Sequence, residues 1–344
     1  MRSQACIHMI AAGLAATLVL TSCNGDHKNN SGPSIHGVWR LIQTSHTPSR
    51  GSGAQLIYDA ARQRMLLVGW STDRVWEWSG SDWRSVDTVG GTRTETHLTA
   101  AYDASRGRVV VFDGKAFLEL DGDQWNRLQP APSPPREASA LAYDPVRHAL
   151  LLSGGYTGTG QRSGDTTSLH EVWQLQQDRS AHDRLFQLPI EGGPRARSMH
   201  ALVTGPDRVF LIGGRSEGWV LETYLSDVWI WDGKAWSGAP ALPVGLAAFG
   251  ASFDTERNRL VVFGGTGRSV TIVVYGETLE FDGQQWLQVA SSARPSPRLG
   301  SAMAYDPRHK NVVLYGGESS EGYQNDTWIY EGPPPQVLRG DQRE

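Results

Sequence analysis

The chain has 344 residues, with 32 lysines and arginines against 36 aspartates and glutamates, and a formal net charge of −4 at pH 7. This mildly acidic balance argues against broad binding of nucleic acids. The only cysteines are Cys6 and Cys23, so no disulfide can hold together the long segment that follows them. The stability of that segment must come from a hydrophobic core, which a chain of this length can bury.

The first 22 residues predict a secretory signal peptide. Arg2 provides a short basic start, and the apolar stretch 10–20 is too short to span a membrane. The tetrapeptide Leu20–Cys23 resembles the bacterial lipobox, which implies cleavage before Cys23 and attachment of lipid to it. By the same resemblance, Asn24 implies the outer membrane of a bacterial cell envelope. The alternative is an ordinary signal peptide with a cysteine at this place by chance.

Three segments follow the signal peptide. Residues 23–35 are polar and contain Gly, Asn, Ser and Pro, which is typical of a flexible tether. Residues 36–332 contain a repeated pattern and are expected to form one domain. Residues 333–344 are rich in proline and charge, so we expect a disordered tail.

The domain consists of six copies of one pattern, which residues 302–317 show most clearly. In AMAYDPRHKNVVLYGG a strand of small residues ends in an aromatic residue and Asp, a polar turn follows, and an apolar strand ends in Gly-Gly. Copies recur at intervals of roughly forty to sixty residues, the range of propeller blades. The aromatic residue or its substitute is Tyr58, Tyr102, Tyr143, Thr204, Phe253 and Tyr305.

Two more strands are expected in each copy. The third has spaced aromatic or apolar residues, and in three copies an Asp-Gly pair follows, the preferred tight hairpin turn. A Trp then opens the fourth strand at Trp83, Trp125, Trp236 and Trp286, and Phe186 takes that place in the third copy. Four antiparallel strands with short hairpins make up a propeller blade.

This pattern resembles the kelch repeat, which is related to the propeller of galactose oxidase, over about residues 37–331. The copies depart from it at Gly69-Trp70 and Asp113-Gly114, where Gly-Gly is expected, and at Thr204-Gly205 in place of Tyr-Asp. The predicted fold is therefore an all-β, six-bladed propeller. The sixth copy lacks a Trp, so we expect Val38–Ile42, which contains one, to supply its outer strand and close the ring.

A four-stranded meander sends its connections to two faces. The short-turn face carries the turns between first and second strands, where arginines stand beside repeated Asp; we expect solvated turns with local ion pairs worth little. The long-loop face carries inserts in blades 3 to 6, at residues 156–170, 215–226, 266–276 and 318–325. Long loops on a rigid scaffold are where function concentrates, so the long-loop face is the predicted working surface.

Candidate ligand-binding residues lie on the long-loop face. Arg136, Arg197 and Arg298 each stand seven residues before the anchor residue of a blade, where guanidinium groups can hold a carboxylate. The alternative is that these arginines are scaffold residues that pair with a loop acid such as Glu137 or Glu318. The other candidates are Glu95, at the equivalent place in blade 2, and Tyr156, Arg215 and Glu318, at the starts of long loops.

Two hypotheses for function follow. The first is a non-catalytic, membrane-anchored module, expected as a monomer, that presents its long-loop face to a glycan or an envelope protein. The second is a carbohydrate-active enzyme resembling the kelch-type sialic acid epimerases, with Glu95 or Glu318 as acid or base beside Arg197 or Arg298. No motif of that family identifies a catalytic residue here.

No cofactor is expected in either case. The copper chemistry of galactose oxidase depends on a Cys–Tyr crosslink, and the domain has no cysteine. The histidines are scattered, and no two have metal-ligand spacing, so no metal site is predicted.

Overall fold

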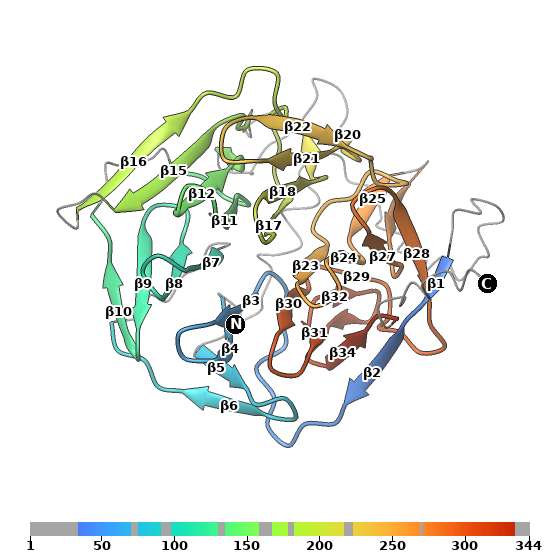
Figure 1. Cartoon of the computed structure of the whole chain (residues 1–344). Coiled ribbons are helices and arrows are strands. Elements are labelled where there is room, and N and C mark those ends of the chain that lie inside the picture. Colours follow the sequence, from blue (N-terminus) through green and yellow to red (C-terminus); the bar gives the residue numbers. More distant parts are fainter. Residues whose placement is uncertain are drawn as a thin grey trace, which may run out of the picture.

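The computed structural model describes residues 34–69, 75–90, 98–129, 135–157, 167–177, 182–216, 223–268 and 271–333. In these residues, six sheets of four antiparallel strands surround a common axis (Figure 1). The predicted all-β, six-bladed propeller is thereby confirmed. The expected signal peptide, Cys23, most of the tether, Glu95 and residues 334–344 lie outside the described residues. No helix able to cross a membrane occurs in the part of the chain that is described.

Blades 1 to 3 follow the chain order from the innermost to the outermost strand. Blade 1 contains β3 (Gln55–Asp59), β4 (Arg64–Val68), β5 (Val75–Trp78) and β6 (Trp83–Val86). Blade 2 contains β7 (Thr99–Asp103), β8 (Arg108–Phe112), β9 (Phe117–Asp121) and β10 (Gln124–Arg127). Blade 3 contains β11 (Ala140–Asp144), β12 (Ala149–Ser153), β15 (Val172–Gln177) and β16 (Asp183–Leu188).

Blades 4 and 5 repeat this order, and blade 6 takes its outer strand from the N-terminal side. Blade 4 contains β17 (Ala201–Thr204), β18 (Val209–Ile212), β21 (Val228–Trp231) and β22 (Trp236–Ala239). Blade 5 contains β23 (Gly250–Asp254), β24 (Arg259–Phe263), β27 (Thr278–Phe281) and β28 (Trp286–Ala290). Blade 6 contains β30 (Ala302–Asp306), β31 (Asn311–Tyr315), β34 (Thr327–Glu331) and β2 (Val38–Ile42).

The ring closes as predicted. Strand β2 pairs antiparallel with β34, from Val38 opposite Glu331 to Ile42 opposite Thr327. Residues 34 and 35 were expected in a flexible tether, but they belong to β1 (Ser34–His36), which pairs in parallel with the outer strand β28 of blade 5. The N-terminal segment therefore covers the exposed edges of two neighbouring blades (Figure 1).

Apolar side chains fill the seams between blades. Six clusters of buried residues occur in the described chain, each shared by two neighbouring blades. Trp39 on β2 lies at the seam between blades 5 and 6, where its Nε1 donates to Thr278 Oγ1 at 2.9 Å and its ring packs on Phe263 and Tyr330. The outer-strand Trp therefore packs into the seam and joins the two blades.

The prediction that Phe186 takes the place of the fourth-strand Trp in blade 3 is wrong. In blade 4, Trp231 is paired with the fourth-strand Trp236, whereas in blade 3 the equivalent residue of the third strand, Leu175, is paired with Leu185. Leu185 is buried, and Phe186 next to it is 43% exposed. Because successive side chains of a strand point to opposite faces, a one-residue difference in register places Phe186 outside the core.

The Gly-Gly pairs join each blade to the next. Gly155 has a φ of +93°, and its amide donates to the carbonyl of Arg197 in blade 4 at 2.9 Å. A Cβ at Gly155 would lie 2.6 Å from the carbonyl oxygen of Glu137, so only glycine fits this approach. The pairs that begin at Gly213, Gly264 and Gly316 make the same kind of contact with the following blade.

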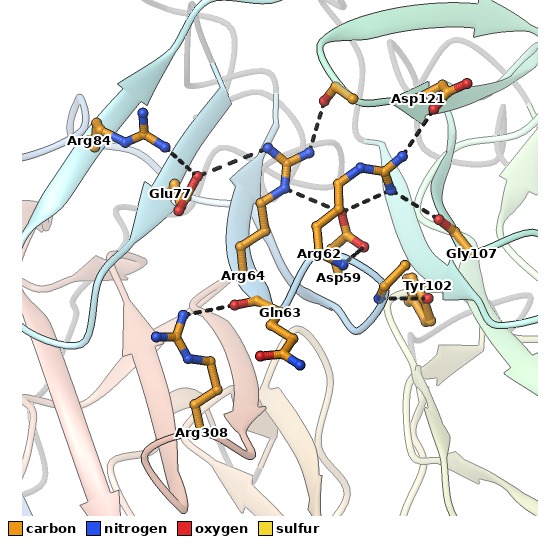
Figure 2. Close-up of polar contacts among 12 residues, drawn as sticks. Asp59, Arg62, Gln63, Arg64, Glu77, Arg84, Tyr102, Gly107, Asp121 and Arg308 are labelled. Atoms are coloured by element: carbon orange, nitrogen blue, oxygen red, sulfur yellow. Dashed lines mark hydrogen bonds and ion pairs between the residues drawn. The ribbon is translucent and has the colours of Figure 1, made fainter.

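The short-turn face is more ordered than expected. Asp59 is 1% exposed and receives Arg62 and Arg64, and Arg62 also reaches blade 2, where it donates to the carbonyl of Gly107 at 3.1 Å and to Asp121 at 3.0 Å (Figure 2). The sequence led us to expect solvated local pairs. These arginines instead link neighbouring blades, because the ring brings the turn of one blade against the hairpin of the next.

Candidate functional site

A cavity of about 230 Å³ opens at the axis on the long-loop face. Its lining comes from all six blades, because every innermost strand begins beside the axis. The inserts of blades 4, 5 and 6 add the short ribbons β19 (Arg215–Ser216) with β20 (Thr223–Tyr224), β25 (Thr266–Arg268) with β26 (Ile272–Val274), and β32 (Glu318–Ser319) with β33 (Gly322–Tyr323). Residues of these ribbons form part of the cavity wall.

A collar of backbone hydrogen bonds surrounds the cavity. The amide of Met199 donates to the carbonyl of Ala138 at 3.0 Å, Ala248 to Met199 at 2.9 Å, Gly300 to Ala248 at 2.7 Å, and Gly53 to Gly300 at 2.9 Å. All five residues have φ between 50° and 84° and line the cavity. The equivalent part of blade 2 falls in residues 91–97, outside the described chain. Left-handed backbone in non-glycine residues is strained, and here it persists because the ring fixes it.

Two charged side chains belong to the cavity wall in the described chain, Arg215 and Glu318. Arg215 is 8% exposed, and its backbone makes two hydrogen bonds of 2.9 Å with Ser198, which fix the β19 ribbon on blade 4. Glu318 begins β32, and burial raises the pKa of its carboxyl above the usual range. The site therefore combines a cation with a carboxyl group that is easier to protonate than a solvated one.

The rest of the lining is divided by chemistry. The hydroxyl-bearing residues are Ser52, Ser139, Tyr224, Thr266, Ser301 and Ser319. An apolar wall comes from Leu98, Met199, Phe249, Ile272, Val274 and Leu299. A few polar groups among apolar and aromatic side chains are typical of small-molecule sites. In the described part of the chain, no cluster of His, Cys, Asp and Glu could hold a metal ion.

The three predicted arginines lie inside the blades. Arg197 is 1% exposed and donates to both carboxylate oxygens of Asp227, at 3.0 and 2.7 Å, and to the carbonyl of Gly213 at 2.8 Å. Arg298 makes the same set with Asp326 and the carbonyl of Gly316. Arg136 pairs with Glu171 and with the carbonyl of Gly154.

This geometry favours the scaffold alternative for those arginines. In blades 4 and 6 the same acid also accepts the indole N–H of the third-strand Trp, from Trp229 to Asp227 and from Trp328 to Asp326, both at 2.7 Å. The arginine thus fixes the Gly-Gly turn and the start of the third strand of its own blade. The partner acids lie just before the third strand and are not the loop acids, Glu137 or Glu318, that the sequence suggested.

The other sequence candidates divide between cavity and scaffold. Arg215 and Glu318 line the cavity. Tyr156, on β13 (Tyr156–Thr157), is 4% exposed, and its hydroxyl donates to Glu137 Oε2 at 3.0 Å. Glu95 lies outside the described residues. The structure therefore brings two of the seven candidates to one site.

Sequence reasoning missed most of the remaining wall, and His200 is its most unusual member. His200 is 7% exposed, and neither ring nitrogen has a hydrogen-bond partner among the described residues. Burial, with a smaller contribution from the positive charge of Arg197, lowers the pKa of His200 to about 3. This histidine is therefore neutral at physiological pH. It lies directly before the innermost strand β17, and nothing in the sequence shows that its ring nitrogens lack partners.

Comparisons with known proteins agree with this architecture. Residues 196–243 match a family model described as the Kelch motif. A solved structure titled "Structure of YjhT" superposes with a TM-score of 0.62, covering 85% of this chain and 99% of that chain, at 14% sequence identity. The fold is therefore a kelch-type β-propeller, with a Kelch motif in residues 196–243. At that identity the likeness extends to the fold alone, and fold does not specify function.

Proposed function

We propose that this protein is a kelch propeller of the bacterial cell envelope, anchored through lipid on Cys23, that binds a small glycan ligand with a carboxylate in its axial cavity. The observation that carries the proposal is the cavity at the axis, which all six blades line and to which Arg215 contributes a buried cation. At about 230 Å³ the cavity is smaller than the pockets that hold drug-sized ligands, and it suits a single sugar unit.

The chemistry of the wall supports a sugar acid. A guanidinium has five N–H donors, so Arg215 can keep its contacts within the protein and still bind a carboxylate. The hydroxyls of Ser52, Ser139 and Tyr224 are matched to sugar hydroxyls as donors and acceptors. The ring of Phe249 supplies an apolar surface for the C–H face of a sugar.

Binding can be tested by titration calorimetry of the purified protein against uronic and sialic acids and the matching neutral sugars. We expect acidic sugars to bind and Arg215→Ala to weaken binding by about tenfold or more, since a charge-assisted hydrogen bond is worth on the order of 1.5–3 kcal/mol. Arg215→Lys keeps the charge and should retain part of the affinity. Partial binding by this variant would show that the loss in Arg215→Ala does not come from misfolding. Arg84→Ala is the matched control, because Arg84 lies on the outer strand β6 with its side chain 72% exposed.

An envelope protein on the long-loop face is the other ligand of this binding function. A pull-down from envelope extracts distinguishes the two. Capture of a protein whose binding an acidic sugar does not displace would exclude the cavity as the working site.

A second candidate function is acid/base isomerisation of the bound sugar, of the kind the kelch-type sialic acid epimerases perform. The specific observation that favours it is the raised pKa of Glu318, which burial causes, since a carboxyl that is easier to protonate than a solvated one suits proton transfer. Proton NMR of anomer or epimer interconversion is the assay. Glu318→Gln should abolish turnover and retain sugar affinity. If the parent protein binds the sugar but does not interconvert its forms, the protein is a binder and the isomerase function is wrong.

A further inference from the structure

Among the described residues, the seam between blades 4 and 5 lacks the clamp present at other seams of the short-turn face. Elsewhere a basic side chain of a first turn crosses to the neighbouring blade. Examples are Arg62 to the carbonyl of Gly107 at 3.1 Å, Arg106 to Asp183 at 2.6 Å, Lys310 to Glu256 at 2.8 Å, and Arg308 to the carbonyl of Gln63 at 2.8 Å. In blade 4 the first turn is two residues shorter, and Arg208 pairs with its neighbour Asp207 at 2.6 and 2.9 Å.

The blade 5 side of this seam also has an apolar anchor residue where blade 2 has a tyrosine. In blade 2 the anchor residue is Tyr102, whose hydroxyl accepts a hydrogen bond from the amide of Ala61 in blade 1 at 3.0 Å. The anchor of blade 5 is Phe253, which has no hydroxyl. Phe253 stacks instead on Phe210 of blade 4, with ring centroids 5.8 Å apart and planes 15° apart.

A cleft of about 300 Å³ results at this seam. Its floor consists of Phe210, Ile230, Phe253 and Phe281, and its rim of Pro206, Asp207, Arg208, Asn258 and Gly283. The cleft lies on the short-turn face, opposite the axial cavity, and the proposed glycan function does not use it. An apolar floor under a charged rim is suited to an apolar side chain flanked by charged ones.

The described chain ends across the first turn of blade 5 from this cleft, on the side that faces blade 6. Strand β34 runs to the short-turn face, and Gly332 after it packs directly on the guanidinium of Arg257, where a Cβ would clash. Arg257 belongs to the first turn of blade 5 and is followed by Asn258, which is part of the rim. Pro333, the last described residue, is therefore separated from the cleft by the first turn of blade 5.

The composition of residues 334–344 fits the cleft. In PPQVLRGDQRE, Val337 and Leu338 are the only apolar side chains besides proline. Leu338 is five residues beyond Pro333, a reach of about 17 Å for an extended chain. Arg339 and Asp341 follow, with charges opposite to those of Asp207 and Arg208 on the rim.

From this we propose that Val337 and Leu338 of the C-terminal segment dock in the cleft between blades 4 and 5 and take the place of the missing clamp. The segment then adds contacts across this seam on the short-turn face, and its release would loosen blades 4 and 5 relative to each other there.

Hydrogen exchange of the whole purified protein, read by mass spectrometry, tests this docking. Leu338→Asp removes the apolar anchor, and Gln342→Asp is the matched control, with the same new charge in the same segment. We expect peptides that cover 204–210 and 253–258 to exchange severalfold faster in Leu338→Asp and at the parent rate in Gln342→Asp. Equal exchange in all three proteins overturns the proposal. A co-purified small molecule that slows the exchange of these peptides equally in both variants would also overturn it.

Disulfide trapping provides an independent readout. Cys6 and Cys23 are the only native cysteines, so a new pair is readily identified by peptide mapping. Asn258→Cys with Leu338→Cys should crosslink under mild oxidation within one chain, and faster than Asn258→Cys with Gln342→Cys. Equal rates for the two pairs would mean random collisions of a tethered segment and would overturn the docking.

Discussion

The guanidinium of Arg197 donates to both carboxylate oxygens of Asp227, from Nη1 to Oδ1 at 3.0 Å and from Nη2 to Oδ2 at 2.7 Å. The arginine stands before the innermost strand of blade 4, and the acid stands before the third strand. The pair therefore connects two strand starts that the chain separates by thirty residues. Its equivalents in blades 3 and 6 show that this is a repeated element of the blade.

Replacement of Arg197 by Met is expected to reduce stability and leave ligand binding by the folded protein unchanged. Removing one partner of a buried pair costs about 3–5 kcal/mol, and we expect about 3 because the Asp227 side chain is 34% exposed. Urea unfolding measures the loss, and calorimetry on the folded fraction measures affinity. Weaker binding with unchanged stability would mean that Arg197 contacts the ligand.

The glycine of the blade-to-blade turn provides a second prediction. Gly155→Ala should destabilise the protein by more than Gly122→Ala, although both glycines have positive φ. A Cβ at Gly155 meets the Glu137 carbonyl at 2.6 Å, whereas a Cβ at Gly122 has no heavy atom within 4 Å. We expect about 1 kcal/mol at Gly122 from backbone strain and at least about 2 more at Gly155. Thermal unfolding compares the two, and equal losses would contradict the close-approach explanation.

The fold was predictable because the blade repeats local signals. Tyr-Asp, Gly-Gly and Asp-Gly each mark a turn with a defined backbone requirement, and six copies in register identify the architecture. Asp306, for example, accepts the amides of Arg308 and His309, which is the local reason for the repeated Asp. The ring closure by β2 followed from the Trp missing in the last copy.

The site was predictable only in part, because its wall is made by contacts distant in sequence. Spacing placed Arg136 and Arg197 near the axis, but spacing does not reveal the acid that turns each guanidinium into the blade. Arg215 and Glu318 were found because they begin long loops. Phe249 and His200 were not, since the sequence does not show whether a residue just before an innermost strand faces the cavity or the seam.

Ring closure predicts a large loss of stability when the N-terminal strand is removed. A chain that begins at Thr44 lacks β1 and β2 and with them Trp39, whose buried indole is worth about 3–5 kcal/mol. We expect its melting temperature to fall by many degrees relative to a chain that begins at Ser34. Agreement of the two within a degree or two would mean that blade 6 is stable without its outer strand.

Lipid attachment depends on one residue. Cys23→Ala should leave an unprocessed precursor and no incorporated lipid, since the sulfur of Cys23 is the expected acyl acceptor. Radiolabelled palmitate in growing cells is the measurement, with Cys6→Ala as the control that should be labelled like the parent. Label on the Cys23→Ala protein would disprove the assignment.

Acid sensitivity should depend on His200. Its pKa is about 3 in the folded protein against 6.5 in the unfolded chain, so the unfolded chain binds a proton that the folded protein does not. Its contribution is therefore fully present above pH 6.5 and is lost as the pH falls from 6.5 toward 3. The loss approaches on the order of 5 kcal/mol over that range.

His200→Leu keeps an apolar side chain of similar burial and cannot bind the proton. We expect its free energy of unfolding, measured by urea at successive pH values, to fall less steeply between pH 6 and pH 4 than that of the parent protein. His170→Leu is the control, because His170 is an exposed histidine. Parallel pH profiles for the parent and His200→Leu would show that water or ligand compensates the buried imidazolium, and that this isolated histidine does not set the acid limit of the fold.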